Sequence, residues 1–431
     1  MSSDSDKSAL RRIAVDLTPM LPGGANGGAK GFILELVREL AALSPQTEFI
    51  LLTQAATHEE LAALERANVR RLLAIGPSGS APTASLPARL LFRILPHLPV
   101  RVATSVARVG SRLITALKRR KSNPMIAQLD ADLLFCPFTA PTYHDPGVPL
   151  VSTIYDMQYA AYPEFFTATE IAHRGRSIDE ACRKSDMLIA ISEFSRLELI
   201  ARAGLDPSRV QTVHLQISKH LLAATNQAPA ILAKLNLKTA QYLIYPANFW
   251  KHKNHEMLLT AFGMARARGL APDIRLVCTG APGERQQWLL KAARNMNLAD
   301  DLLFPGYLSD DELLALISNS AGLIFPSLYE GFGLPVAEAM ALGIPVGCNN
   351  VASLPEIAGD ATILFDPWVP EQIADAMISL THDEALRQQL IARGRIQAAR
   401  FVDSRQMAKQ YLATFDDVVG RRRTTSARAQ P

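Results

Sequence analysis

The sequence is poor in the features that mark secreted, metal-binding and membrane-spanning proteins. It has four cysteines in 431 residues, and no two are spaced as Cys-x-x-Cys. Their apolar surroundings predict buried, reduced thiols rather than a disulfide framework or a cysteine metal site. No run of about 20 apolar residues could span a membrane. The opening segment, MSSDSDKSALRR, lacks the apolar core of a signal peptide. We therefore expect a cytoplasmic protein of two or three domains.

Acidic residues are missing from a long stretch of the N-terminal half. Between Arg66 and Gln128 there are twelve Lys and Arg residues but no Asp or Glu, although the whole chain carries a net charge of only +4. Residues 101–121 also have an apolar stripe at helical spacing. Such a helix can lie in a lipid interface, or its stripe can pack on a sheet while its charges face water. We expect residues 89–121 to contact an anionic membrane at its inner, cytoplasmic face. No nucleic-acid motif accompanies this segment.

Short apolar strands alternate with amphipathic helices along most of the chain. The strands expected in the first half are residues 12–17, 48–53, 133–137, 150–155 and 187–191, and a helix is expected over 58–68. A polar, alanine-rich stretch over 223–238 then reads as a linker, and the alternation restarts at residue 242. This pattern predicts two doubly wound parallel sheets, in domains 1–222 and 239–402. Ligands bind such sheets at the carboxyl ends of their strands, so we expect a cleft between the domains.

The most informative segment is LYEGFGLPVAEAMALGIPV, which begins at residue 328. Glu330 follows a buried strand, and Gly331 and Gly333 leave backbone N–H groups bare before a helix that starts near Pro335. A helix start of this kind attracts anions. Glu338 lies one turn inside the helix, where its carboxylate could accept two hydrogen bonds from a sugar diol. Taken singly, Glu330 could instead cap the helix, and Glu338 could be a solvated residue.

The Glu-x7-Glu spacing, with GYLSDDEL at 306–313 and LPEI at 354–357, resembles the retaining glycosyltransferases of family four. That resemblance implies the GT-B architecture, an α/β fold in which two Rossmann-like domains face a central cleft. It implies that Glu330 lies against the transferred hexose and that Glu338 binds the ribose of the nucleotide. It also implies a C-terminal helix, residues 403–419, that crosses back to the first domain. We expect residues 420–431 to be a disordered tail.

Two further segments extend the resemblance. In NFWKHKNH, Lys253 stands where the family binds the donor diphosphate, but the arginine usual five residues earlier is Asn248 here. Asp156 follows a strand where the family often has His-Asp, so it is a candidate for orienting the acceptor hydroxyl, or else a plain turn residue. His252 and His255 lack a third metal ligand. The resemblance places these further residues in the donor site: Gly27, Gly28, Gly331, Phe332, Gly333, Leu334 and Tyr307.

No metal site is expected. The glycines near residue 27 do not spell G-x-G-x-x-G, so they predict no dinucleotide cofactor and could form a plain flexible turn. Asp130 and Asp132 do spell the Asp-x-Asp of metal-dependent glycosyltransferases. They stand at the start of a strand, which is the wrong end for a site in an α/β sheet. The GT-B resemblance also implies activity without a bound metal.

Together these features predict transfer of a hexose, with retention, from a nucleotide sugar to a glycan or lipid-linked acceptor in cell-surface polysaccharide synthesis. The NFWKHKNH segment resembles bacterial polysaccharide mannosyltransferases and favours GDP-mannose, while UDP-glucose and dTDP-rhamnose stay open. Two alternatives are a sugar-nucleotide epimerase of the same shape and a GT-B subunit that only binds. The Glu330–Glu338 pair argues against both.

The basic segment generates the first testable prediction. The full chain should co-sediment with anionic vesicles at low salt and detach at high salt, because each basic residue near an anionic surface contributes only about 1 kcal/mol. Neutral vesicles are the control. Equally weak binding to both vesicle types at low salt would contradict a membrane role for residues 89–121.

Overall fold

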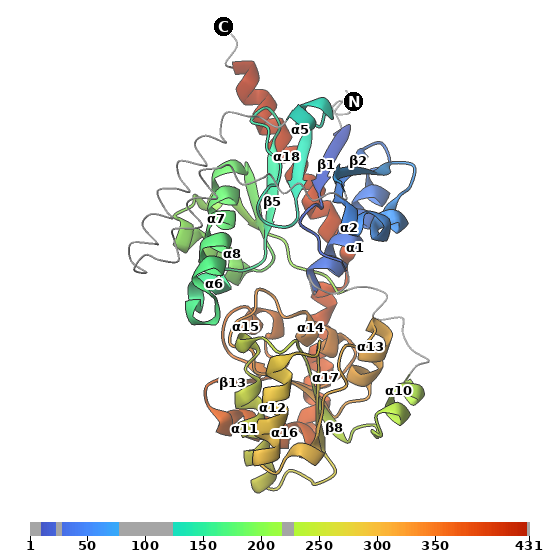
Figure 1. The fold of residues 1–431 in the computed structure, drawn as a ribbon, viewed down its shortest axis with the longest axis vertical. Helices are drawn as coiled ribbons and strands as arrows, with labels where there is room; N and C mark the ends of the chain where they lie inside the picture. Colours follow the sequence, from blue (N-terminus) through green and yellow to red (C-terminus); the bar gives the residue numbers. More distant parts are fainter. Residues whose placement is uncertain (1–9, 23–27, 77–123, 218–227, 429–431) are drawn as a thin grey trace, which may run out of the picture.

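The computed structural model describes residues 10–22, 28–76, 124–217 and 228–428. Over these ranges the chain forms two α/β domains, one above the other in Figure 1, with the N-terminal domain uppermost. Each domain contains one sheet, and every strand pairing in the two sheets is parallel. The two doubly wound sheets predicted from the strand–helix alternation are therefore present.

Over the described ranges the N-terminal sheet has seven strands, and β1 inside it pairs with β2 on one side and with β4 on the other. Its strands, in spatial order, are β3 (Val69–Ile75), β2 (Glu48–Gln54), β1 (Arg12–Asp16), β4 (Leu133–Cys136), β5 (Leu150–Ile154), β6 (Met187–Ala190) and β7 (Val210–Thr212). The central strands are buried along almost their whole length, as expected of strands covered by helices on both faces. The order reverses between β1 and β4, which is where such sheets leave a crevice.

The helices of this domain are α1 (Gly28–Leu43), α2 (Ala55–His58), α5 (Pro124–Gln128), α6 (Gln158–Ala161), α7 (Ala168–Lys184) and α8 (Glu193–Ala203), with 3-10 turns η1 (Glu59–Leu64), η3 (Pro163–Phe165) and η4 (Pro207–Arg209). Two of these helices, α7 and α8, begin at side-chain caps. Thr167 and Glu170 form a reciprocal capping box at the start of α7. The helix predicted over 58–68 is present only in part: α2 ends at His58, the 3-10 turn η1 ends at Leu64, and β3 follows as an edge strand.

The C-terminal sheet repeats the same plan around β8. Its strands, in spatial order, are β10 (Leu302–Leu303), β9 (Arg275–Thr279), β8 (Tyr242–Pro246), β11 (Gly322–Phe325), β12 (Val346–Asn349) and β13 (Ile363–Phe365). Its helices are α10 (Ala228–Lys234), α11 (His255–Ala267), α12 (Glu284–Asn295), α13 (Asp310–Ser318), α14 (Leu334–Ala341), α15 (Leu354–Ala358), α16 (Pro370–His382) and α17 (Glu384–Ala398), with 3-10 turns η5 (Lys251–Lys253), η6 (Ala299–Asp301) and η7 (Ala399–Phe401). Residues 228–234 of the expected linker are thus helix α10, with Ile231 buried.

The last helix, α18 (Ser404–Arg428), leaves the C-terminal domain and runs along the N-terminal domain, where it packs against α1 (Figure 1). The rings of Tyr411 and Phe415 lie 5.5 and 5.2 Å from that of Phe135 on β4. The disordered tail expected from residue 420 is wrong as far as Arg428, because the helix continues. Arg422 anchors this extension through an ion pair with Asp186 at 2.7 Å.

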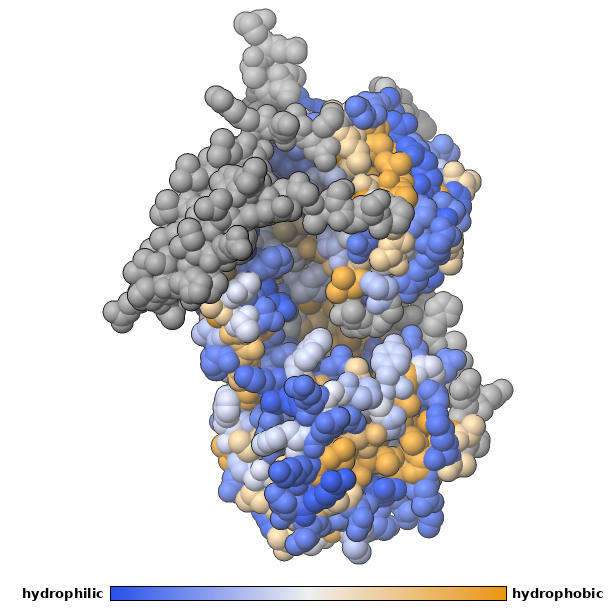
Figure 2. Space-filling model, in the orientation of Figure 1, coloured by the Kyte–Doolittle hydropathy of each residue, from blue (hydrophilic) through white to orange (hydrophobic). Residues whose placement is uncertain are grey.

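The visible surface is mostly hydrophilic, with smaller apolar areas on both domains (Figure 2). The four cysteines are buried free thiols. Within the described ranges, no helix is both long enough and apolar enough to cross a membrane. The whole basic segment expected to contact lipid, residues 89–121, lies outside the described residues.

Candidate active site

Two loops of the C-terminal domain meet at the carboxyl ends of its two central strands. Lys253 follows β8, and Glu330 follows the neighbouring strand β11. The Lys253 Nζ lies 2.5 Å from Glu330 Oε1, and the two side chains are only 12% and 14% exposed. The backbone beside them is fixed, since the Tyr245 hydroxyl donates to the Lys253 carbonyl at 2.7 Å. Two predicted site residues thus form a mostly buried ion pair at the point where the strand order reverses.

The loop after Glu330 touches the other domain through backbone atoms. A Cβ added to Gly331 would lie 2.3 Å from the Tyr155 carbonyl oxygen at the end of β5. Gly333 has a φ of +102°, and a Cβ there would lie 2.2 Å from a Leu354 methyl group. Glycine is therefore required at both positions, by close approach at the first and also by left-handed backbone at the second. Among the described groups, none accepts a hydrogen bond from the N–H of Gly331, Phe332 or Gly333.

Asp156 follows β5 and lies beside this loop. Its carboxylate accepts a hydrogen bond from the Gln158 N–H at 2.9 Å. Burial raises the pKa of Asp156, and the negative charge of Glu330 acts in the same direction, whereas Arg174 on α7 lowers it. The structure therefore brings Asp156 into the electrostatic field of Glu330, as a site between the two domains requires.

Glu338 is the fifth residue of α14, one turn inside the helix. Burial, and secondarily the charge of Asp310, raises the pKa of its carboxyl group to about 7. This carboxyl group makes no hydrogen bond or ion pair with any residue in the part of the chain that the structure describes. A half-buried carboxylate without a partner among the described residues is costly to ionise, which marks Glu338 as a group suited to a ligand.

The remaining predicted donor residues differ in where the structure places them. Gly28 and Leu334 face each other across the domain boundary, since a Cβ on Gly28 would lie 3.1 Å from a Leu334 methyl group. Asn248 instead orients a neighbouring turn by accepting the Ala281 N–H at 3.0 Å. Tyr307 is 68% exposed. Gly27 lies outside the described residues.

The two histidines near Lys253 are not arranged as metal ligands. Burial lowers the pKa of both His252 and His255 to about 3, with further contributions from nearby cationic groups. The His255 ring packs against Tyr245 and Phe249, with centroids 4.8 and 4.9 Å away. Across the described ranges, no cluster of three or more His, Cys, Asp or Glu side chains could hold a metal ion.

Asp130 and Asp132 precede β4 and so lie at the amino end of that strand, away from the loops described above. Asp132 accepts hydrogen bonds from the backbone N–H groups of Arg11 and Arg12 at 2.8 and 3.0 Å, and it pairs with Arg423. Its oxygens thus hold the start of the sheet together.

Sequence reasoning missed several residues that hold the Glu330 loop in place. Tyr329 is buried against the N-terminal domain, where its hydroxyl donates to Glu198 and accepts the Met157 N–H. Ser192 and Ser353 donate to loop carbonyls from opposite sides. Their partners are more than 20 residues away in sequence, so no local motif could reveal these contacts.

Comparison with known proteins now identifies the C-terminal domain. Residues 228–397 match the family model described as glycosyl transferases group 1. These residues are therefore similar to the group 1 glycosyltransferases. The match covers β8 to β13, and with them Lys253, Glu330 and Glu338. The predicted resemblance is confirmed in the domain where its motifs lie.

Curated relatives extend the similarity beyond this domain. O-antigen chain mannosyltransferase B of Escherichia coli is 29% identical over 269 residues, covering 60% of this chain and 70% of that protein. The serotype-specific mannosyltransferase WbdA of Escherichia coli is 29% identical over 222 residues, which are 51% of this chain but only 27% of WbdA. D-inositol 3-phosphate glycosyltransferase of Salinispora tropica is 27% identical, over 96% of this chain and 87% of that enzyme.

Solved structures establish the fold of the whole chain. Anabaena HepE, in complex with UDP and glucose, superposes with a TM-score of 0.67 at 15% identity, over 94% of this chain and 100% of HepE. A glycosyltransferase from Rickettsia africae gives the same TM-score, at 13% identity over 95% of this chain and 99% of that one. Together with the two parallel sheets, these likenesses confirm the GT-B fold.

The close approach at Gly331 generates the second prediction. Gly331→Ala should force the loop away from the Tyr155 carbonyl and separate the domains, so the radius of gyration in solution scattering should increase. Gly31→Ala is the matched control, because a Cβ there would meet nothing within 4 Å and alanine suits a helix interior. An unchanged radius for both variants would contradict a close backbone contact between the domains in solution.

Proposed function

We propose that this chain is a retaining hexosyltransferase that moves mannose from GDP-mannose to a glycan or lipid-linked acceptor in cell-surface polysaccharide synthesis. The observation that carries the proposal is the Lys253–Glu330 ion pair beside the bare N–H groups of Gly331–Gly333. In such a transfer, negative charge grows on the departing diphosphate. The ammonium of Lys253 and the loop N–H groups can stabilise that charge in a site largely shielded from water.

Glu330 has two tasks in this proposal. Its carboxylate orients Lys253, and it lies where the hexose would sit between the domains. Asp156 would then orient the acceptor hydroxyl from the opposite side. We favour a role in which Glu330 holds the sugar over one in which it forms a covalent bond.

Glu338 is assigned to the ribose. Two vicinal hydroxyls can donate to one ionised carboxylate, and Glu338 is half-buried without a partner among the residues that the structure describes. Donor binding would therefore compensate for the cost of burying this charge.

The choice of mannose rests on relatives. Two of the similar proteins are named as an O-antigen chain mannosyltransferase and a serotype-specific mannosyltransferase. A third is named as a D-inositol 3-phosphate glycosyltransferase, and the structural neighbour HepE was solved with UDP and glucose. Because these names differ in donor and acceptor, the test below includes other donors, and the acceptor class is tested with them. A cytoplasmic location stays a prediction of the sequence.

A donor panel tests the function. The full chain is incubated with GDP-mannose, UDP-glucose or dTDP-rhamnose and with lipid-linked glycan acceptors, and the products are identified by mass and by anomeric NMR. We expect nucleoside diphosphate release with GDP-mannose and an acceptor carrying one more hexose in the donor's anomeric configuration. Lys253→Ala and Glu330→Ala should each lower the rate about 10²- to 10³-fold. Lys251→Ala is the control, because this exposed lysine lies two residues away in the same turn.

Two arms of this experiment separate the alternatives. An epimerised nucleotide sugar without acceptor modification would indicate an epimerase, and binding without turnover would indicate a silent subunit.

Chelator should leave transfer unchanged, since Asp132 is committed to backbone N–H groups and to Arg423. Activity lost in chelator and restored by Mg²⁺ or Mn²⁺ would overturn the metal-independent mechanism.

The raised pKa of Glu338 predicts a pH dependence of donor binding. Only the ionised carboxylate accepts both ribose hydrogen bonds, so the donor KM should rise as pH falls below 7, by up to about tenfold per pH unit. Glu338→Gln should have a high KM that does not change between about pH 6 and 8. His252 and His255 do not titrate in this window, because their pKa values are about 3. The same pH profile in both proteins would contradict the ribose role.

A further inference from the structure

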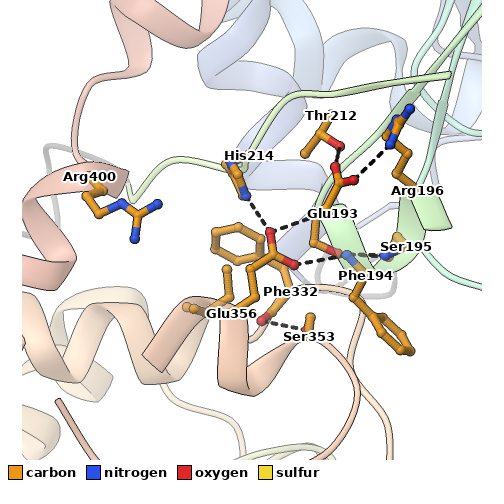
Figure 3. Close-up of polar contacts among 12 residues, drawn as sticks. Glu193, Phe194, Ser195, Arg196, Thr212, His214, Phe332, Ser353, Glu356 and Arg400 are labelled. Carbon is orange, nitrogen blue, oxygen red and sulfur yellow. Dashed lines mark hydrogen bonds and ion pairs between the residues drawn. The ribbon is translucent and has the colours of Figure 1, made fainter. Parts of the chain in front are cut away.

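A carboxylate of the C-terminal domain binds the start of a helix in the N-terminal domain. Glu356 lies on the short helix α15, and Figure 3 shows its carboxylate pointing out toward α8. It accepts the N–H of Glu193 at 2.9 Å and that of Phe194 at 3.0 Å, and it lies 2.6 Å from His214 Nε2. These three partners all belong to the N-terminal domain. Glu356 therefore makes a three-point contact across the domain boundary.

This contact supplies what α8 lacks on its own. The first N–H groups of a helix have no partner within the helix. Ser192, the N-cap, accepts only the Ser195 N–H, at 3.1 Å. The Glu193 side chain cannot substitute for Glu356, because its carboxylate is held by Arg196 and Thr212. Glu356 thus completes the cap of α8 and places a negative charge at the positive end of the helix dipole.

The electrostatics favour an ionised Glu356. Partial burial acts to raise its pKa, but the hydrogen bonds from His214 and from the N–H groups of Glu193 and Phe194 outweigh that effect and hold the pKa below its ordinary value. Charge-assisted hydrogen bonds of this kind are among the stronger ones in proteins. Separating the domains would break all of them together.

The same two helix starts also hold the Glu330 loop. From α15, the Ser353 hydroxyl lies 2.9 Å from the carbonyl oxygens of both Glu330 and Phe332. From α8, the Ser192 hydroxyl donates to the Gly331 carbonyl at 2.6 Å. Three consecutive carbonyls of the loop are therefore held from both domains. Glu356 joins the two helices that hold them.

The helix that carries Glu356 is fixed within its own domain, and His214 packs against the rings beside the loop. Gln397 on α17 donates to the Ile357 carbonyl at 2.9 Å and so fixes α15 within its own domain. Around His214, the rings of Phe332 and Phe401 lie 6.2 and 5.7 Å away, and they lie 5.5 Å from each other. A movement of Glu356 relative to α8 would thus be transmitted to the loop at Phe332.

We propose that Glu356 and His214 are positioning residues, which hold the two domains closed and thereby set the loop that carries Glu330. They act on the reaction through the geometry of Glu330 and Lys253. No contact of theirs with the donor is required. The inference rests on the proposed transferase function for its kinetic part, whereas its structural part can be tested without any substrate.

The structural test is hydrogen exchange and solution scattering on the full chain without substrate. Glu356→Ala should speed exchange in peptides covering the start of α8 at least about tenfold and should increase the radius of gyration, with an unchanged melting temperature. Glu356→Gln keeps one acceptor oxygen, so its exchange rates and radius of gyration should lie between those of Glu356→Ala and those of wild type. Asp360→Asn is the matched control, because this nearby carboxylate is exposed and, among the described residues, pairs with Arg393 of its own domain. It should behave as wild type.

The kinetic test separates this inference from the proposed function. Glu356→Ala should lower kcat about 10²-fold, as expected when reacting groups are misplaced by about 1 Å, with a smaller change in donor KM. Glu356→Gln should recover part of kcat, and His214→Ala should lower it in the same direction. Wild type could turn over no donor while Glu356→Ala still increases exchange and the radius of gyration. In that case the proposed transferase function would be wrong, but the role of Glu356 in holding the domains together would stand. The inference would be overturned if Glu356→Ala had the same exchange rates, radius of gyration and kcat as wild type. It would also be overturned if a lower melting temperature explained the loss of kcat.

Discussion

The site depends on one close approach, that of the Gly331 backbone to the carboxyl end of β5. This contact places a loop of one sheet against the strand end of the other, and only glycine allows it, because a Cβ would lie 2.3 Å from the Tyr155 carbonyl. This contact also fixes the positions of the residues that precede Gly331. Tyr329 is buried among N-terminal residues, and Glu330 is brought near Asp156. Neither domain alone contains this set of groups.

Two arrangements of charged groups near this contact are not explained by a contribution to the stability of the fold. Burying an ion pair such as Lys253–Glu330 removes both charges from water, and well-packed apolar residues often serve stability as well or better. Glu338 is a clearer case, because burial raises its pKa and no described residue compensates. Both arrangements make sense if negative charge and hydroxyl groups of a ligand complete them. These charged groups then lower the stability of the free protein because they are arranged to bind a ligand.

Local patterns in the sequence predict the parts of the site that lie on one loop. The apolar runs of β8 and β11 and the glycines at 331 and 333 suffice to place Lys253 and Glu330 at neighbouring strand ends. They could not reveal Glu356, whose partners Glu193 and His214 are more than 140 residues away. Errors in the fold have similar causes. β3 is an edge strand with alternating exposure, and α10 is a short helix held by tertiary contacts of Ile231, so neither stands out from its own sequence.

The replacement at Asn248 fits an arrangement that needs both domains. Asn248 uses its side chain to hold the turn at Ala281, so it adds no positive charge beside Lys253. A second cation comes from the opposite domain, since Arg174 on α7 is near enough for its charge to lower the pKa of both Asp156 and His252. An arginine held on the N-terminal domain contributes to the field at Lys253 only while the domains stay together. Closure by Glu356 then sets the charge of the site as well as its shape. An open form would keep Lys253 but lose the contribution of Arg174 to the positive potential that favours a diphosphate.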